Sequence, residues 1–143
     1  MAVRVELSRI LIRELNDYQL IELREVAEGQ DIPAEAARSF PIVIGLPEAQ
    51  AIDRRLKGMV ISRPQTHDLM ANLIAELGGT LRSITINDLS DHTFFATLDI
   101  DGTDGQELKI DSRPSDAIAL GVASGVPIYV EEHVIEAASA EEA

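Results

Sequence analysis

Two Arg-Pro steps, fifty residues apart, constrain the fold of this chain more than any other feature of its sequence. Residues 63–68 (RPQTHD) and 113–116 (RPSD) each carry a hydroxyl residue and then an aspartate, just ahead of an apolar stretch. Proline disfavours helical geometry in the residue before it and fits the first turn of a helix. At both steps the chain is therefore predicted to pass from an extended segment or loop into a helix.

The two steps form a near-repeat whose arginines are predicted to stand beside helix N-termini. Free backbone N–H groups, the positive end of the helix dipole and a guanidinium meet at such a point, and this combination binds phosphate. Thr66 and Ser115 are predicted N-cap residues. The candidate phosphate-binding residues are Arg63, Arg113, Thr66 and Ser115. The alternative is structural: the hydroxyls cap the helices, and the aspartates pair with the dipole or with the arginines.

Hydrophobic periodicity and turn signals predict an α/β (α+β) fold in two related βα-containing halves without a linker. The predicted strands cover residues 3–7, 18–26, 40–45, 84–86, 94–100, 108–110 and 127–130. Helices are predicted from Pro47 to Lys57, from Thr66 to Leu77 and from Pro114 to Ser124. Residues 29–39 are predicted to form a loop that holds at most a short helix. We expect one compact domain, with a mixed or antiparallel sheet and packed helices.

The helix after the first Arg-Pro step has the most regular apolar pattern in the chain. Its apolar residues recur at the spacing of one helix face and are predicted to lie in the core: Leu69, Met70, Leu73, Ile74 and Leu77.

At 143 residues the chain is long enough to bury a core without metal or disulfide support. The expected domain covers residues 2–135, and residues 136–143 are expected to form an acidic, disordered tail. Residues 131–143 are predicted to hold one or two helical turns before that tail. Neither a signal-peptide core nor an apolar run of the roughly 20 residues that cross a bilayer is present. We therefore expect a cytoplasmic protein that does not interact with a membrane.

Several chemistries are excluded by motifs that the sequence lacks. With no cysteine, the chain forms no disulfide, thiol nucleophile or cysteine-based zinc site. It contains neither a phosphate-binding P-loop nor a dinucleotide-binding GxGxxG, and no GxSxG nucleophile elbow. No organic cofactor is expected.

Charge argues against a nucleic-acid ligand. The formal net charge is −13, whereas phosphate backbones normally bind basic surfaces. Ten of the twelve basic residues are arginine, a bias suited to fixed ion pairs or to bidentate phosphate contacts, although genomic base composition produces the same bias. The hydrophobic content of 45% fits a homo-oligomer as well as a monomer with a well-buried core.

His67 is the histidine best placed for chemistry. Adjacent to Asp68 and four residues after Arg63, it is a candidate general base toward water or a metal ligand. The alternative is a first-turn residue hydrogen-bonded to a neighbouring carbonyl. Glu48, beside Pro47 at another helix start, is either a carboxylate facing the same cleft or an acid favoured by the helix dipole.

Motifs spread over most of the chain resemble the bifunctional nuclease family, formerly a domain of unknown function. They are residues 40–45 (FPIVIG), 48–52 (EAQAI), 63–69 (RPQTHDL), 111–120 (DSRPSDAIAL) and 127–128 (PI). The resemblance runs in order from about residue 3 to residue 135. It implies a compact α/β domain that cleaves DNA and RNA, with nucleic acid as the substrate.

If the chain hydrolyses phosphodiesters, the matched positions supply the groups that the reaction needs. Arg63 and Arg113 are assigned to the phosphate and His67 to proton transfer. Glu48, Asp68 and Asp116 are assigned to orientation or to a divalent ion, with Mg²⁺ or Mn²⁺ as the possible cofactor. The competing hypothesis is a non-catalytic, oligomeric protein-interaction or regulatory module, and a third is small-anion binding at the helix starts.

Overall fold

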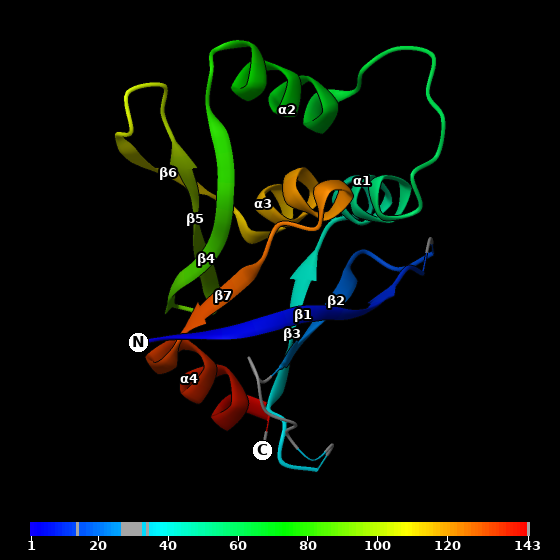
Figure 1. Ribbon diagram of the computed structural model, residues 1–143. Helices are drawn as coiled ribbons and strands as arrows, with labels where there is room; N and C mark the ends of the chain where they lie inside the picture. Colours follow the sequence, from blue (N-terminus) through cyan, green and yellow to red (C-terminus); the bar gives the residue numbers. More distant parts are fainter. Residues whose placement is uncertain (14, 27–32, 34, 143) are drawn as a thin grey trace.

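The computed structural model describes residues 1–13, 15–26, 33 and 35–142, and within them seven strands form one mixed sheet (Figure 1). The strand order is β3-β2-β1-β7-β4-β5-β6. The strands are β1 (Ala2–Leu11), β2 (Gln19–Glu25), β3 (Ser39–Ile44), β4 (Thr80–Ser90), β5 (Thr93–Asp101), β6 (Glu107–Ser112) and β7 (Ile128–Glu131). The helices are α1 (Leu46–Leu56), α2 (Thr66–Glu76), α3 (Pro114–Gly121) and α4 (Glu132–Glu142), and a 3-10 turn covers Val122–Ser124. The predicted fold class is confirmed.

The sheet is assembled from two antiparallel three-stranded units, each followed by a helix. The first unit is β1–β2–β3 with α1, and the second is β4–β5–β6 with α3. Strand β7 joins them, pairing antiparallel with β1 and parallel with β4. None of the described helices is long and apolar enough to cross a membrane.

The sheet curls around a single hydrophobic core. Strands β3 and β5 lie far apart in the strand order, yet the rings of Phe40 and Phe94 stack with their centroids 5.5 Å apart. Buried residues from α1, α3 and α4 complete the core, including Ile52, Ile118 and Ile135, each 0% exposed. The curl therefore brings the edge strand β3 beside the start of β5.

A buried carboxylate lies on the other face of the second unit. Because strand residues alternate between faces, Asp99 points away from the core that its neighbours Leu98 and Ile100 enter. Asp99 is 2% exposed and accepts hydrogen bonds from four side chains: Ser83, Thr85, Thr97 and Lys109. Burial alone raises the pKa of a carboxyl, but these donors outweigh it and hold the pKa of Asp99 below its usual value.

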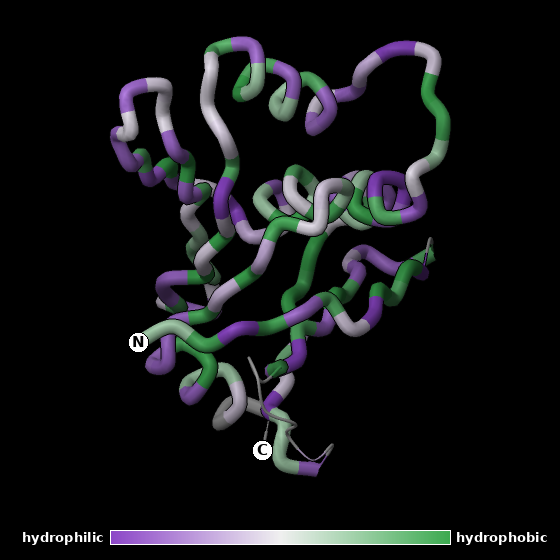
Figure 2. Tube along the Cα trace, viewed as in Figure 1, coloured by the Kyte–Doolittle hydropathy of each residue, from purple (hydrophilic) through white to green (hydrophobic). Residues whose placement is uncertain are grey.

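The predicted burial of α2 is wrong for three of its five apolar residues. Leu69, Leu73 and Leu77 are 52%, 51% and 78% exposed, whereas Met70 and Ile74 are partly buried against the core. The helix stands at the margin of the molecule and packs on α3 and β4 with one side (Figure 2). The apolar stripe is wider than this contact, so part of it faces outward.

Helix α4 is longer than the one or two turns predicted for the C-terminal segment. It continues to Glu142, and Ala138 in its second half is 4% exposed because the helix packs on β3, β4 and β7. The proposed limits of the domain, 2–135 and 136–143, stay a prediction. Residues 29–32 and 34 of the loop predicted at residues 29–39 lie outside the described residues, and β3 already begins at Ser39.

Candidate active site

Helices α1 and α3 begin side by side, each with a proline and an acid in its first turn. Glu48 and Asp116 are both the third residue of their helices. Arg113 occupies the N-cap position of α3 with an extended backbone, as expected for a residue before proline. The two equivalent carboxylates of the two units thus lie near one guanidinium.

Four side chains form a continuous chain of polar contacts at this point. His67 Nε2, from the first turn of α2, lies 2.9 Å from Asp116 Oδ1. Arg113 donates from Nε to Asp116 Oδ2 over 2.8 Å and from Nη2 to Asp116 Oδ1 over 3.2 Å. It also donates from Nη1 to Glu48 Oε1 over 3.0 Å. All four line a pocket of about 340 Å³, hereafter the His67 pocket.

The polar contacts favour the charged forms of Asp116 and Arg113. Burial opposes the ionisation of Asp116, but the hydrogen bonds from Arg113 and His67 outweigh it and lower the pKa of that carboxyl. The hydrogen bonds to Asp116 and then to Glu48 raise the pKa of Arg113. His67 is 8% exposed, whereas 63% of the Arg113 side chain is exposed. The guanidinium is therefore accessible to a ligand.

Asp68 does not belong to this chain of contacts, although the sequence placed it among the catalytic candidates. It accepts a hydrogen bond from the Gln65 backbone N–H at 2.9 Å, pairs with Arg54 at 3.0 Å and hydrogen-bonds to Arg55. Burial raises its pKa, but these contacts outweigh burial and lower it. Asp68 is absent from the lining of the His67 pocket. Its contacts fix α2 to α1.

Three of the four predicted phosphate-binding residues lie at or beside the pocket. Arg113 lines it, and so does Thr66, an exposed residue at the start of α2. Ser115 follows Pro114 in α3 and is 5% exposed. Arg63 is exposed, does not line the pocket and makes no ion pair with the described part of the chain. The two arginines of the near-repeat therefore occupy different surroundings, and only Arg113 lies at the pocket.

The predicted N-caps are wrong at both steps. The N-cap residues are Gln65 and Arg113, so Thr66 is the first residue of α2 and Ser115 the second of α3. Neither hydroxyl makes a capping hydrogen bond. Pro114 occupies the first position of α3, so the helix begins two residues earlier than a Ser115 cap requires, because the fixed φ of proline already suits the helix.

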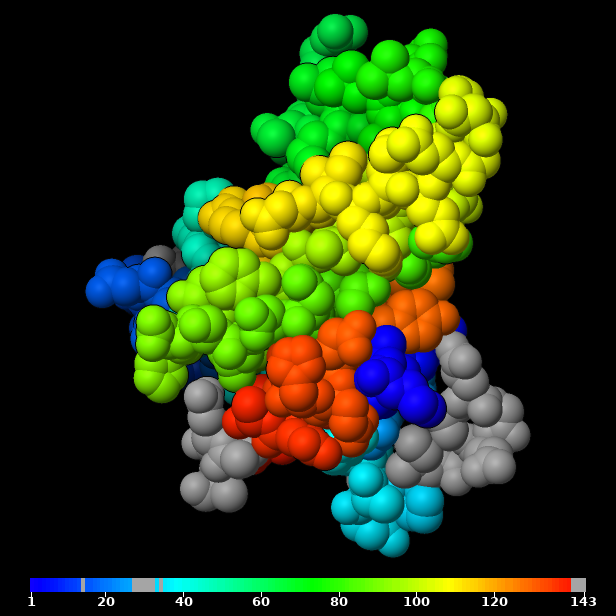
Figure 3. Space-filling model, turned by 90° about the vertical axis from the view of Figure 1, so that its left-hand side faces the viewer, coloured from blue at the N-terminus to red at the C-terminus, as the bar shows by residue number. Residues whose placement is uncertain are grey.

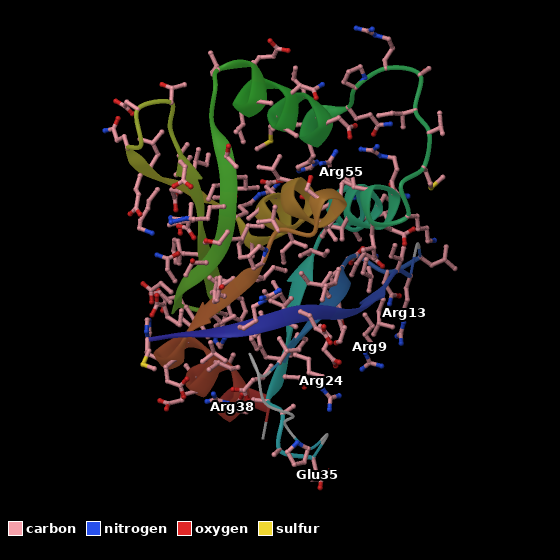
Figure 4. All side chains as sticks on the ribbon, in the orientation of Figure 1. Arg9, Arg13, Arg24, Glu35, Arg38 and Arg55 are labelled. Atoms are coloured by element: carbon pink, nitrogen blue, oxygen red, sulfur yellow. The ribbon has the colours of Figure 1, made fainter. Side chains whose placement is uncertain are left out.

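Arg54 and Arg55 are residues that the sequence analysis did not single out. Both lie in the last turn of α1, where basic residues complement the helix dipole. Arg55 is 9% exposed and also donates to the Ala119 carbonyl at 2.5 Å and the Leu120 carbonyl at 3.0 Å. Figure 4 shows it among the helices. The sequence shows two adjacent arginines in a predicted helix, but this pattern does not indicate which residues they contact.

The described carboxylates do not form a ready-made metal site. No group of three or more His, Asp or Glu residues in the described part of the chain is arranged to hold an ion. Glu48 and Asp116 both accept hydrogen bonds from Arg113. A divalent cation bound between these two carboxylates would have to displace that guanidinium.

Comparison with known proteins identifies the family. A family model described as Bifunctional nuclease domain matches residues 32–143. The chain belongs to this family. Two relatives from Mycobacterium tuberculosis, Uncharacterized protein MT1877 of strain CDC 1551 / Oshkosh and Uncharacterized protein Rv1829 of strain ATCC 25618 / H37Rv, are each 45% identical over 102 residues. These matches cover 71% of this chain and 60% of each relative, so the relatives extend beyond the shared region.

Membership of the bifunctional nuclease family confirms the resemblance seen in the sequence. It also suggests what chemistry the four linked side chains of the His67 pocket could perform. The matched region contains all four of them, Glu48, His67, Arg113 and Asp116. A histidine held by a carboxylate beside an accessible guanidinium combines a proton-transfer group with an anion-binding group. This combination is suited to reactions at phosphate.

Proposed function

We propose that the His67 pocket hydrolyses phosphodiester bonds in DNA and RNA. One observation carries the proposal: in a member of the bifunctional nuclease family, His67, Asp116, Arg113 and Glu48 form a continuous polar chain along one pocket. The substrates and the individual roles of these residues are part of the proposal.

Arg113 is assigned to the scissile phosphate. Its contacts with Glu48 and Asp116 use three of the five guanidinium N–H groups, and the side chain is 63% exposed. The two remaining N–H groups suit phosphate oxygens. Ser115 adds a hydroxyl and a backbone N–H from the first turn of α3, where the helix dipole favours an anion. Together these donors stabilise the charge that develops on the phosphate in the transition state.

His67 is assigned to proton transfer. When Nε2 carries the proton shared with Asp116, Nδ1 is left as the basic nitrogen. Water attacks phosphorus and gives a proton to His67 while the bond from phosphorus to the leaving oxygen breaks. The same proton then passes to that oxygen. Asp116 keeps the ring in position and stabilises the imidazolium that forms between the two transfers.

The test compares cleavage of single-stranded DNA and RNA by the parent, His67→Ala and Arg113→Met proteins. Each variant is expected to lose about 10²-fold or more in rate, the scale of a general base or of one charge-stabilising group. The matched controls are His133→Ala and Arg9→Met, which change residues whose side chains are 65% and 61% exposed and pair with Asp88 and Glu22. Unchanged rates in both site variants would contradict the assignment.

A requirement for Mg²⁺ or Mn²⁺ stays a prediction, and each ion and a chelator are separate arms of the same assay. Loss of activity with the chelator, restored by either ion, would support a metal recruited with the substrate. Equal activity in all arms would show that the polar chain works without one.

A non-catalytic interaction module is the second candidate function. The three carboxylates in the first turns of α1, α2 and α3 are paired with arginines, which are Arg54, Arg55 and Arg113. The whole chain carries a net charge of −13. The outward apolar residues Leu69, Leu73 and Leu77 offer a contact surface for a second copy. A parent protein that cleaves neither substrate and sediments as an oligomer would favour this function over the nuclease.

A further inference from the structure

A second, larger pocket lies next to the His67 pocket and shares the Arg113–Glu48 ion pair with it. Its volume is about 460 Å³, and Arg113 and Glu48 line both. We call it the β3 groove, because residues 41–45 at the end of β3 form one of its walls. A ligand that reaches from one pocket into the other must pass the guanidinium.

The two walls of the β3 groove come from segments that the curl of the sheet brings together. One wall is the edge strand β3, where Pro41 lacks the N–H that would pair with another strand. The other wall is the tip of the β4–β5 hairpin, residues 92–94. Ile42, Phe94 and Pro114 make much of the lining apolar. Apolar walls of this kind suit the flat face of a nucleobase.

The hairpin tip holds a histidine at the groove in an uncommon backbone conformation. Asp91 and His92 have φ values of 50° and 63° and form the two-residue connection between β4 and β5. Such turns require positive φ at both positions and favour asparagine or glycine there. His92 lines the groove in spite of this preference, which places a polar ring where a base would enter.

Ser115 provides a further polar group at the groove. It lines the β3 groove and is 5% exposed, and its hydroxyl makes no hydrogen bond to the part of the chain that the structure describes. The Ser115 hydroxyl oxygen keeps some accessible surface, so a water molecule or a ligand oxygen in the groove can be its partner. This hydroxyl lies two residues from Arg113, where the groove meets the ion pair. Arg113 and the Ser115 hydroxyl therefore face the same part of the groove, where a phosphate could contact both.

We propose that the β3 groove holds the base and sugar of one unpaired nucleotide next to the phosphate bound at Arg113. The proposal rests on the proposed nuclease function and specifies its substrate as single-stranded DNA or RNA. The groove volume falls within the range of about 300–1,000 Å³ that is usual for small-molecule sites. A base paired in a duplex presents only its edge, so it must leave the stack to enter the groove.

The test measures binding separately from cleavage. It uses the His67→Ala variant, which lacks the proposed proton-transfer group and should not cleave the probes. The probes are a fluorescein-labelled oligothymidylate, the same strand with abasic sugars in place of nucleosides, and its duplex. Fluorescence anisotropy is expected to show about tenfold tighter binding of the base-bearing strand than of the other two, the scale of one stacked base.

Val43→Gln tests whether the groove causes this preference. Val43 lines the groove and is 62% exposed, so a longer, uncharged and non-aromatic side chain blocks the groove without disturbing the core. The matched control is Val60→Gln, at a residue that is 99% exposed and outside the groove. Val43→Gln is expected to bind all three probes equally, while the control keeps the preference. Thermal unfolding of both variants shows that they are folded.

The outcomes separate the groove from the nuclease. Equal binding of the base-bearing and abasic strands, or a preference that survives Val43→Gln, overturns the groove whatever the cleavage result. A preference that depends on Val43, in a protein whose parent cleaves nothing, supports the groove and refutes the nuclease. Absence of both binding and cleavage overturns both proposals.

Discussion

Replacing Arg55 with methionine is expected to destabilise the fold more than any change to a surface arginine. Methionine keeps most of the aliphatic stem but removes the guanidinium, which joins α1 to Asp68 of α2 and to the carbonyls of Ala119 and Leu120 in α3. Those carbonyls belong to the last turn of α3, where helix carbonyls lack partners within the helix. The substitution therefore weakens the contacts among three helices at once.

The magnitude follows from the burial of these groups. Removing one partner of a buried ion pair costs about 3–5 kcal/mol, and each buried carbonyl left without a donor costs about 1 kcal/mol or more. Asp68 keeps Arg54 at 3.0 Å, which reduces the first contribution. We expect a total loss of about 3–5 kcal/mol from a typical stability of about 5–15 kcal/mol, or a fall in Tm of about 8–15 °C.

Urea denaturation followed by circular dichroism measures the loss, and Arg9→Met is the matched control. Arg9 lies on the β1–β2 hairpin, is 61% exposed at its side chain and pairs with Glu22 at 3.3 Å (Figure 4). An exposed pair of this kind contributes less than about 1 kcal/mol. If Arg55→Met lost no more stability than Arg9→Met, the guanidinium would not be the link among the helices, and the reasoning would be refuted.

Three further predictions concern the sheet, the margin of the core and acid. Asp99→Ala is expected to cost about 3 kcal/mol in urea denaturation, since three half-buried hydroxyl groups and the exposed Lys109 ammonium lose their acceptor. On α2, Leu73→Ala is expected to change stability by about 0.5 kcal/mol or less and Ile74→Ala by about 1–2 kcal/mol, and equal effects would contradict the exposure of Leu73. The folded-state pKa values of Asp68, Asp99 and Asp116 lie below 3.8. Their stabilisation is complete above that pH and is lost as pH falls through the lowered values, so Tm measured across pH 2–7 should drop below about pH 4.

Sequence periodicity predicted most elements because local patterns suffice for it. Strands β2, β3 and β7 and the starts of α1, α2 and α3 lie within two residues of their predicted positions. A strand needs only alternation and a turn signal, and a helix start needs only a proline and an acid. The burial of α2 was not predictable in this way, since an apolar stripe does not state how many neighbours will cover it.

The near-repeat predicted two related halves but paired the wrong segments. The structural units are β1–β2–β3–α1 and β4–β5–β6–α3, and β6 at the far edge is exposed along most of its length (Figure 3). Their equivalent helix starts are Leu46-Pro47-Glu48 and Pro114-Ser115-Asp116, which share a proline and an acid with the proline shifted by one position. The segment at Arg63 precedes α2, a helix between the units. The equivalence of the two units is visible in the strand order, which cannot be read from the identities of the side chains.

The sequence by itself determined most of the secondary structure, the family and four residues that prove to be neighbours: Glu48, His67, Arg113 and Asp116. Only the tertiary structure decided their partners. Arg113 joins Glu48 because α1 and α3 pack together, and Asp68 pairs with Arg54 and Arg55 because the first turn of α2 comes close to the last turn of α1. The β3 groove exists because the sheet curls until its edge strand β3 lies beside the tip of the β4–β5 hairpin, although several strands separate them in the sheet. Such contacts join residues distant in sequence, and local propensity carries no information about them.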